Sequence, residues 1–372
     1  MIDLADKKGL PGQETLAYRL LALTAVCGEF PARLLGRIPG SMSYKNTVIW
    51  RLKKDGLLRT YYQDRLRGYR LGRKAKRLLL EENPERYGFH LTGKGDTNML
   101  KSEIQRRLRL HRIAESCITM DNAGVAVFRD EKPHVFGEGE AQVPAPVHAA
   151  FYSSREVKEL GIEAVKIRSS RMTGVLAAGS GIFIVYNGGP CGSKWDYRSE
   201  QRVQTFFRVV LCGRRLPVMQ VSGLLFGDGL EPFRRILAEG DSQMRCFFLL
   251  DGNYEHFYYL TNDRRGEVLL RLLCDAGRRM QLDRILMQGL REGDGGLTLE
   301  NDALDGDGNP VLFGYFLDIP RISRFCTALE LQERRGTIVC FDFQKEALER
   351  VCGGRVELSA ISFEKFERRF FS

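Results

Sequence analysis

The apolar positions in the first third of the chain follow a helical spacing, then a strand spacing, and then a helical spacing again. Between residues 14 and 27, Leu16, Leu20, Leu23 and Val26 recur at steps of three and four residues, as one buried helical face requires. The pattern then predicts a short helix over 32–36, a helix over 44–55, strands over 58–62 and 69–71 joined by a basic tip, and a helix over 72–80.

The helix expected over 44–55 has an apolar side and a polar side. Val48 and Leu52 lie four positions apart and are expected to face the core. A serine in the turn at 40–43 is expected to cap the first turn of this helix, and Gly56 is expected to end it. The other sides of the helix then carry Lys45, Asn46, Thr47, Trp50, Arg51, Lys53 and Lys54.

The rest of the chain alternates between helical and extended patterns, without an internal repeat in the sequence. The patterns predict helices over 99–120, 153–161, 199–211, 267–277 and 279–290, strands over 125–128 and 181–186, turns at 187–189 and 302–309, and a parallel strand–helix–strand unit over 337–359. Residues 363–371 form an amphipathic tail that can pack on the domain or on a partner. We therefore expect an α/β protein, α+β overall. Its expected parts are residues 1–90, a linking helix over 91–120, an α/β domain over 121–220 and a C-terminal α/β domain over 221–372.

The positive charge of the chain is concentrated near its start. The 372 residues hold 57 Lys and Arg against 47 Asp and Glu, a net charge of +10. Residues 1–115 hold 24 basic and 12 acidic residues, whereas residues 116–372 hold 33 and 35. A basic block joined to a nearly neutral body is typical of a nucleic-acid-binding module attached to a separately folded domain.

Composition excludes several other classes of protein. With 43% hydrophobic residues and 28% charged residues, the chain can bury cores and is neither collagen-like nor wholly disordered. The start, Met1 to Asp6, is too acidic for a secretory signal, and no apolar run is long enough to span a bilayer. The nine cysteines form no C-x-x-C pair and no zinc-finger spacing with histidine. We expect a cytoplasmic protein with reduced thiols, no cofactor, no metal and no membrane association.

The order of the N-terminal elements, with the strings TVIWRLKKDGLLRTY and YRLGRKAKRLL, resembles a winged helix-turn-helix domain over about residues 10–83. This resemblance implies that the helix over 44–55 enters the major groove of double-stranded DNA while the hairpin contacts the backbone or the minor groove. Asn46 can pair with adenine, and Thr47 can touch a thymine methyl group. The DNA-binding residues expected are Ser43, Tyr44, Lys45, Asn46, Thr47, Trp50, Arg51, Lys54, Arg65, Arg67, Arg70, Arg73 and Lys74.

A second resemblance covers about residues 10–215. The strings FYSSREVKELG, SRMTGVL, IVYNGG and KWDYRSEQR are similar to those of replication-relaxation accessory proteins of plasmids and integrative mobile elements. In that family a winged helix precedes an α/β domain related to restriction-endonuclease-like folds, here expected in a degenerate form. The resemblance implies a replication or conjugative-transfer accessory factor, or a regulator, that binds DNA at such an element. Its expected partners are a relaxase or replication protein and a second copy of the chain.

Three alternatives remain open from the sequence. The string from Glu156 to Lys158 fits the E-x-K motif of a Mg²⁺-dependent restriction-like nuclease, with Asp130, Glu138 or Glu140 as the upstream acid. A ligand-sensing transcriptional repressor would require a deep pocket with convergent polar groups in residues 121–372. A protein-interaction module would bind no DNA at all.

Overall fold

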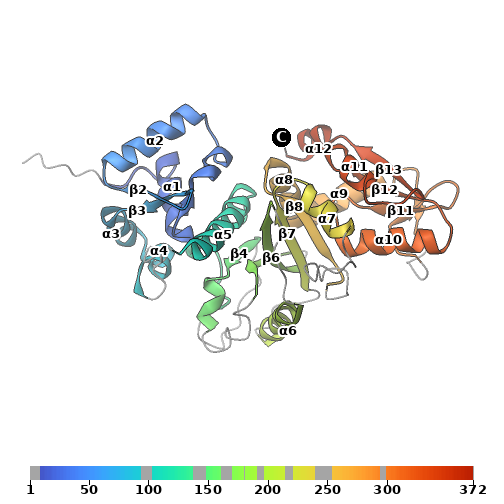
Figure 1. Ribbon diagram of the computed structural model, residues 1–372, viewed down its shortest axis with the longest axis horizontal. Helices are drawn as coiled ribbons and strands as arrows, with labels where there is room; N and C mark the ends of the chain where they lie inside the picture. The colour runs from blue at the N-terminus through green and yellow to red at the C-terminus, as the bar shows by residue number, and fades with distance from the viewer. Residues whose placement is uncertain are drawn as a thin grey trace, which may run out of the picture. The chain divides into compact units, whose positions relative to one another are not determined.

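The computed structural model describes residues 9–93, 103–136, 148–160, 170–179, 181–190, 197–213, 221–238, 254–293 and 299–371. They form a mixed α/β protein with three β-sheets. The chain divides into two compact units, which Figure 1 shows in blue to teal and in green to red. The N-terminal unit is Met1–Asn122 with Ala126–His134, and the C-terminal unit is Ala123–Val125 with Val135–Ser372. Within the described part, no helix has the length and apolar character needed to cross a membrane.

The N-terminal unit is mostly helical, with one small sheet. The strand order of this sheet is β1-β3-β2, and both pairings are antiparallel. Its elements are α1 (Leu16–Cys27), β1 (Phe30–Pro31), the 3₁₀ helix η1 (Ala32–Arg37), α2 (Met42–Lys54), β2 (Leu58–Gln63), β3 (Leu66–Leu71), α3 (Arg73–Glu82), α4 (Pro84–Leu91), α5 (Ile104–Asn122) and the 3₁₀ helix η3 (Arg129–Glu131).

Local sequence signals set the boundaries of these elements. The hydroxyl of Ser41 accepts a hydrogen bond from the amide of Tyr44, so the predicted serine cap of α2 is confirmed. Asp64 and Arg65 form the turn between β2 and β3 with φ angles of 52° and 60°. Positive φ at both central residues suits a two-residue hairpin turn, because it matches the twist of the flanking strands. The predicted hairpin is therefore confirmed.

The C-terminal unit contains two five-stranded mixed sheets. The first has the order β4-β5-β6-β7-β8, and the second has the order β13-β12-β11-β10-β9. The elements of the first half are β4 (Ala150–Ser153), the 3₁₀ helix η4 (Glu156–Leu160), β5 (Met172–Ala178), β6 (Gly181–Gly189), α6 (Tyr197–Gly213), β7 (Val221–Gly227), α7 (Glu231–Ala238), β8 (Phe257–Thr261) and α8 (Arg264–Cys274). The second half contains α9 (Ala276–Leu286), β9 (Arg291–Glu292), β10 (Ala303–Leu304), β11 (Pro310–Phe313), α10 (Ile319–Leu331), β12 (Gly336–Phe341), α11 (Asp342–Glu349), β13 (Val356–Ile361) and α12 (Phe363–Phe371).

The two sheets share one topology. In each, three strands pair antiparallel in sequence order, and two further strands then add in parallel after a helical crossover (Figure 1). A helix follows the last strand in both cases, α8 in the first half and α12 in the second. The order and pairing of the strands therefore repeat, whereas the amino-acid sequence does not. The parallel strand–helix–strand unit predicted over 337–359 is confirmed as β12, α11 and β13.

Several predicted boundaries differ from the structure. Residues 125–128 do not form a strand, and residues 187–189 continue β6 instead of turning. The helix expected over 153–161 is the short 3₁₀ helix η4 in the described residues. The domain boundary expected at residue 220 falls inside the first sheet, because β6 pairs in parallel with β7. The helix expected to link two domains is α5, which belongs to the N-terminal unit and packs against α1.

Candidate nucleic-acid interface

Helix α2 buries one face and leaves the opposite face in solvent. Lys45, Val48, Ile49 and Leu52 are buried. Their spacing of three, four and seven residues places them on one side of the helix. The opposite side is polar, aromatic and cationic, and α2 contains no acidic residue. This face has the composition that contact with a polyanion requires.

Most side chains in the expected DNA-binding set are accessible. Lys74 is half-buried, whereas Lys45 and Arg70 are only 3% and 4% exposed. Their inclusion in the set is therefore corrected. Lys45 shares the register of the core face of α2, and Arg70 is paired with the buried Glu29. The exposed members of the set are Ser43, Tyr44, Asn46, Thr47, Trp50, Arg51, Lys54, Arg65, Arg67 and Arg73.

Two aromatic side chains stand out on the exposed face of α2. Trp50 is 59% exposed and Tyr44 is 53% exposed. The ammonium nitrogen of Lys54 lies 5.1 Å from the centre of the Trp50 ring, one helical turn away. A cation over an indole face keeps the ring and the charge on the same side of the helix. An exposed aromatic beside a cation is a common feature of surfaces that bind other macromolecules.

The hairpin adds a residue that sequence reasoning missed. Tyr62 is 66% exposed and lies directly opposite Arg67 across the β2–β3 pair. The strand period of two could have identified it, because Leu58 and Tyr62 share a face that becomes more exposed toward the tip. Arg59 on β2 and Lys53 on α2 are also exposed, and they extend the basic surface.

The hairpin is held to the rest of its unit by a buried charge cluster, which we define as Glu29, Arg70, Arg107 and His111. The Glu29 carboxylate is bonded to Arg107 at 2.6 Å, to Arg70 at 2.7 Å and to Nε2 of His111 at 2.7 Å. Burial by itself would raise the pKa of Glu29, but the hydrogen bonds from His111, Arg107 and Arg70 outweigh it and lower the pKa to about 2. The carboxylate therefore remains ionised inside the unit.

Arg107 links this cluster to the hairpin turn. It projects from α5 and donates hydrogen bonds to the carbonyl oxygens of Gln63 at 3.1 Å and Leu66 at 3.0 Å, the two residues that flank the turn. The guanidinium groups of Arg70 and Arg107 lie 3.6 and 4.5 Å from the centre of the Tyr61 ring. These contacts fix the hairpin from its base to its tip, so its exposed side chains project from a rigid support.

The described residues of the nuclease alternative form no metal-binding group. Glu156 is buried, and its carboxylate accepts hydrogen bonds from the amide and hydroxyl of Ser153, at 2.8 and 3.0 Å. Asp130 lies in the N-terminal unit and is bonded to Arg86, while Lys158 is exposed. Glu138 and Glu140 lie outside the described residues. Nowhere in the described ranges do three His, Cys, Asp or Glu side chains form a group that could hold a metal ion.

Comparison of the chain with protein-family models, with curated proteins and with solved structures finds no match. The candidate interface is therefore defined by its own geometry. That geometry consists of an acid-free helical face and a cationic hairpin, which are parts of one compact unit.

Proposed function

We propose that the N-terminal unit is a winged helix-turn-helix module that binds double-stranded DNA. In this proposal α2 is the recognition helix and the β2–β3 hairpin is the wing. The observation that carries it is the exposed face of α2, where polar, aromatic and cationic side chains occur without an acidic residue. A helix of this kind fits the major groove and offers its N-terminal side chains to base edges.

The exposed side chains divide into two roles. Asn46 and Thr47, in the first half of α2, can read base edges, since an amide pairs with adenine and a methyl group packs on thymine. Lys54, Arg65 and Arg67 are suited to phosphate oxygens, which supply affinity without sequence information. Tyr62 on the wing can pack against the sugar-phosphate backbone. The proposal therefore predicts specificity from the start of α2 and affinity from its end and from the wing.

The biological setting follows from the second resemblance. We propose an accessory factor for replication or conjugative transfer, or a regulator, acting at a plasmid or mobile-element locus. Docking at such a site would recruit a relaxase or replication protein or repress transcription. A homodimer would bind two half-sites and gain affinity from both.

The test uses the full-length chain and double-stranded DNA. Fragments of the element that encodes the protein are selected for binding, and the affinity for the selected fragment is measured by fluorescence anisotropy at several salt concentrations. We expect Trp50→Ala and Arg67→Gln to weaken binding, whereas the matched charge removal Arg350→Gln, at the exposed residue that follows α11, should leave it unchanged. Absence of DNA binding by the folded wild-type chain at low salt would overturn the proposal and favour the protein-interaction alternative.

A second candidate function, ligand-sensing regulation, is supported by a separate observation. The C-terminal unit contains a cavity of about 280 Å³ lined by several polar side chains. Convergent polar groups in a concave site are the usual mark of a small-molecule site. The hydrogen bonds from Ser153 to the Glu156 carboxylate argue against the nuclease alternative.

A further inference from the structure

The cavity lies where the two halves of the C-terminal unit meet. Its walls come from β6, from β7, from β8 and the residue before it, from α9, and from the chain between the residue before β10 and the first turn of α10. The chain after β11 runs beside the edge strand β8, where Tyr258 and Asp318 form an antiparallel bridge. A volume of about 280 Å³ is close to the lower end of small-molecule pockets, which is about 300 Å³. The site therefore suits a small molecule rather than a peptide.

Strand register places three of the lining residues side by side. Phe183 pairs with Ser222 across β6 and β7, and Gly223 pairs with Phe257 across β7 and β8. His256 consequently lies next to Ser222, and both side chains line the cavity with Phe183. Side chains at the same register of neighbouring strands point to the same face of a sheet.

Asp318 holds the His256 ring in place. It occupies the N-cap position of α10 but makes no capping hydrogen bond. Its carboxylate instead contacts Nδ1 of His256 at 2.6 Å and accepts a hydrogen bond from the amide of Phe257 at 3.1 Å. A proton on Nδ1 leaves Nε2 of the neutral ring as an acceptor. Nε2 has no hydrogen-bond partner among the described residues.

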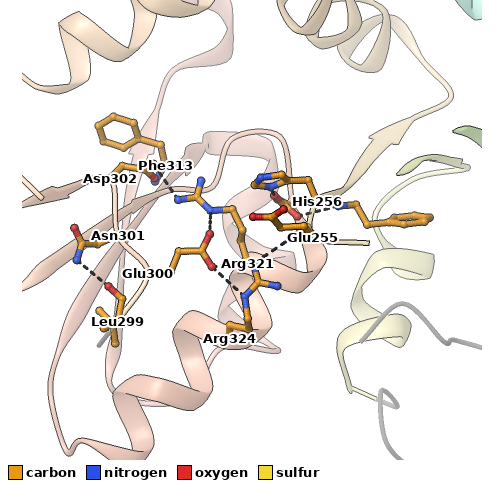
Figure 2. Close-up of polar contacts among 11 residues, drawn as sticks. Glu255, His256, Leu299, Glu300, Asn301, Asp302, Phe313, Arg321 and Arg324 are labelled. Carbon is orange, nitrogen blue, oxygen red and sulfur yellow. Dashed lines mark hydrogen bonds and ion pairs between the residues drawn. The ribbon is translucent and has the colours of Figure 1, made fainter. Parts of the chain in front are cut away.

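A second group of charges is already satisfied within the protein. Figure 2 shows Arg321 and Arg324 of α10 reaching the carboxylate of Glu300, at 2.5 and 2.8 Å. Arg321 also donates to Asp302 at 3.0 Å, and Asp302 accepts from the amide of Phe313 at 2.6 Å. Of these groups, Asp302 and Arg321 line the cavity, and their pairing leaves them little capacity for a ligand.

The charges that remain are one cation and one anion on α9. Arg279 lines the cavity, and its guanidinium makes no hydrogen bond or ion pair with any residue that the structure describes. Asp283, one helical turn later, accepts a single hydrogen bond from the hydroxyl of Tyr315 at 2.6 Å. Burial raises the pKa of Asp283 despite that hydrogen bond. The charge of Arg279 also acts to lower that pKa, but no ion pair within 4 Å joins the two side chains. A cation placed four residues before an anion is the less favourable order for pairing along a helix, so we expect both groups to accept a ligand.

We propose that this cavity binds a free α-amino acid. The ligand carboxylate would accept hydrogen bonds from the Arg279 guanidinium, which is suited to two-point contact with a carboxylate. The ligand ammonium would donate to Asp283 and to Nε2 of His256. The ligand side chain would lie against Phe183, Tyr258 and Phe316, which supply the apolar part of the wall.

Charge complementarity favours this class over its alternatives. A simple anion would face the carboxylate of Asp283, and a simple cation would face the guanidinium of Arg279. A zwitterion satisfies both groups, and these half-buried charges gain from a partner that replaces the water they have lost. The proposal deepens the second candidate function, because it names the ligand, and it does not depend on DNA binding.

The first experiment measures ligand binding without DNA. The thermal unfolding of the full-length chain is followed with each of the twenty L-α-amino acids at millimolar concentration, and the best ligand is titrated by calorimetry. Its decarboxylated amine and its deaminated acid serve as matched probes, because each keeps the side chain and one charge. We expect each probe to bind at least tenfold more weakly than the amino acid. If no amino acid raises the unfolding temperature, or if either probe binds as well as the amino acid, the proposal is wrong.

The second experiment assigns the two charges to their partners. Arg279→Gln should weaken binding of the amino acid at least tenfold and leave binding of its amine unchanged. Asp283→Asn should do the reverse, weakening the amino acid and the amine but not the deaminated acid. Arg284→Gln, an exposed position on the same helix, is the control and should bind like wild type. Loss of binding to all three ligands in both variants, with unfolding temperatures unchanged, would contradict the assignment.

Discussion

The carboxylate of Glu29 and the guanidinium of Arg107 lie 2.6 Å apart, and neither side chain is exposed to solvent. Glu29 follows α1, while Arg107 belongs to α5 and also bonds the carbonyl groups on both sides of the hairpin turn. A buried ion pair adds little net stability, because the cost of removing both charges from water offsets much of their attraction. Its main effect is to fix the orientation of the elements that it joins. The proposed wing therefore takes its orientation from a contact formed 78 residues apart in the chain.

Removing the anion of the buried cluster should destabilise the N-terminal unit strongly. Glu29→Gln leaves Arg70 and Arg107 buried without a counter-charge, and the expected loss is about 3–5 kcal/mol. Hydrogen exchange of peptides from β2 and β3, measured by mass spectrometry on the full-length chain, should increase most. Glu103→Gln removes an exposed carboxylate of α5's N-terminal flank and should change stability by less than about 0.5 kcal/mol. Equal protection of the hairpin in wild type and Glu29→Gln would refute the supporting role of the cluster.

The same carboxylate should make the unit sensitive to acid. Its pKa is about 2 in the fold against an ordinary value of 4.5, so its stabilising effect is complete above about pH 4.5 and is lost as the pH falls toward 2. Each pH unit within that window should cost up to about 1.4 kcal/mol. The buried thiols of Cys27 and Cys117 report unfolding of this unit, and a dipyridyl disulfide labels thiols even in acid. In the wild type, the urea concentration at which these thiols become labelled should decrease as the pH is lowered from 5 to 3. In Glu29→Gln this decrease should be smaller.

The hairpin approaches Glu29 so closely at Gly68 that a larger residue there should destabilise the unit. A Cβ atom added at Gly68 would lie 2.2 Å from Oε1 of Glu29, and the carboxylate cannot move without losing its partners. We expect Gly68→Ala to destabilise the unit by about 1–3 kcal/mol, as overpacking usually does. Gly88→Ala is the matched control, because its Cβ meets no atom within 4 Å and lies inside α4. Hydrogen exchange of the β2 and β3 peptides ranks the two variants. Equal protection of these peptides in Gly68→Ala and Gly88→Ala would contradict the steric argument.

DNA binding by α2 and the wing should separate into two measurable parts. Asn46→Ala should reduce discrimination between the selected site and unrelated DNA by about 1–3 kcal/mol. Arg67→Gln should weaken binding to both DNAs equally and reduce the slope of log affinity against log salt by about 1. Anisotropy titrations at four salt concentrations give both quantities. Identical effects of the two variants on the specific and unrelated DNA would reject this division of roles.

The thiol of Cys326 should be alkylated faster than the equally half-buried thiol of Cys274. A hydrogen bond with Cys352 lowers the pKa of Cys326, whereas burial raises the pKa of Cys274 to about 12. Both cysteines are half-buried, so accessibility does not separate them. We expect Cys326 to be alkylated by iodoacetamide faster than Cys274, by peptide mass spectrometry, and Cys352→Ala to slow it. Alkylation of Cys326 at an unchanged rate in that variant would rule out the hydrogen bond as the cause.

The sequence alone determined the local elements of this protein. The helix that became α2, the β2–β3 hairpin and the unit from β12 to β13 follow from apolar spacing, caps and turn residues, which act within a few positions of the chain. The same spacing placed Val48 and Leu52 inside. Lys45 lies three positions before Val48 and so belongs to the same buried face. Its charge nevertheless predicted an exposed side chain.

Only the tertiary structure decided which distant residues share an environment. Glu29 and Arg107, His256 and Asp318, and the cavity between the two halves of the C-terminal unit bring together residues far apart in sequence. The repeated strand topology of that unit is also invisible in the sequence, because chain path depends on pairing between strands and not on residue identity. Burial of a charge is stable only when partners from other elements surround it, and no local pattern records those partners.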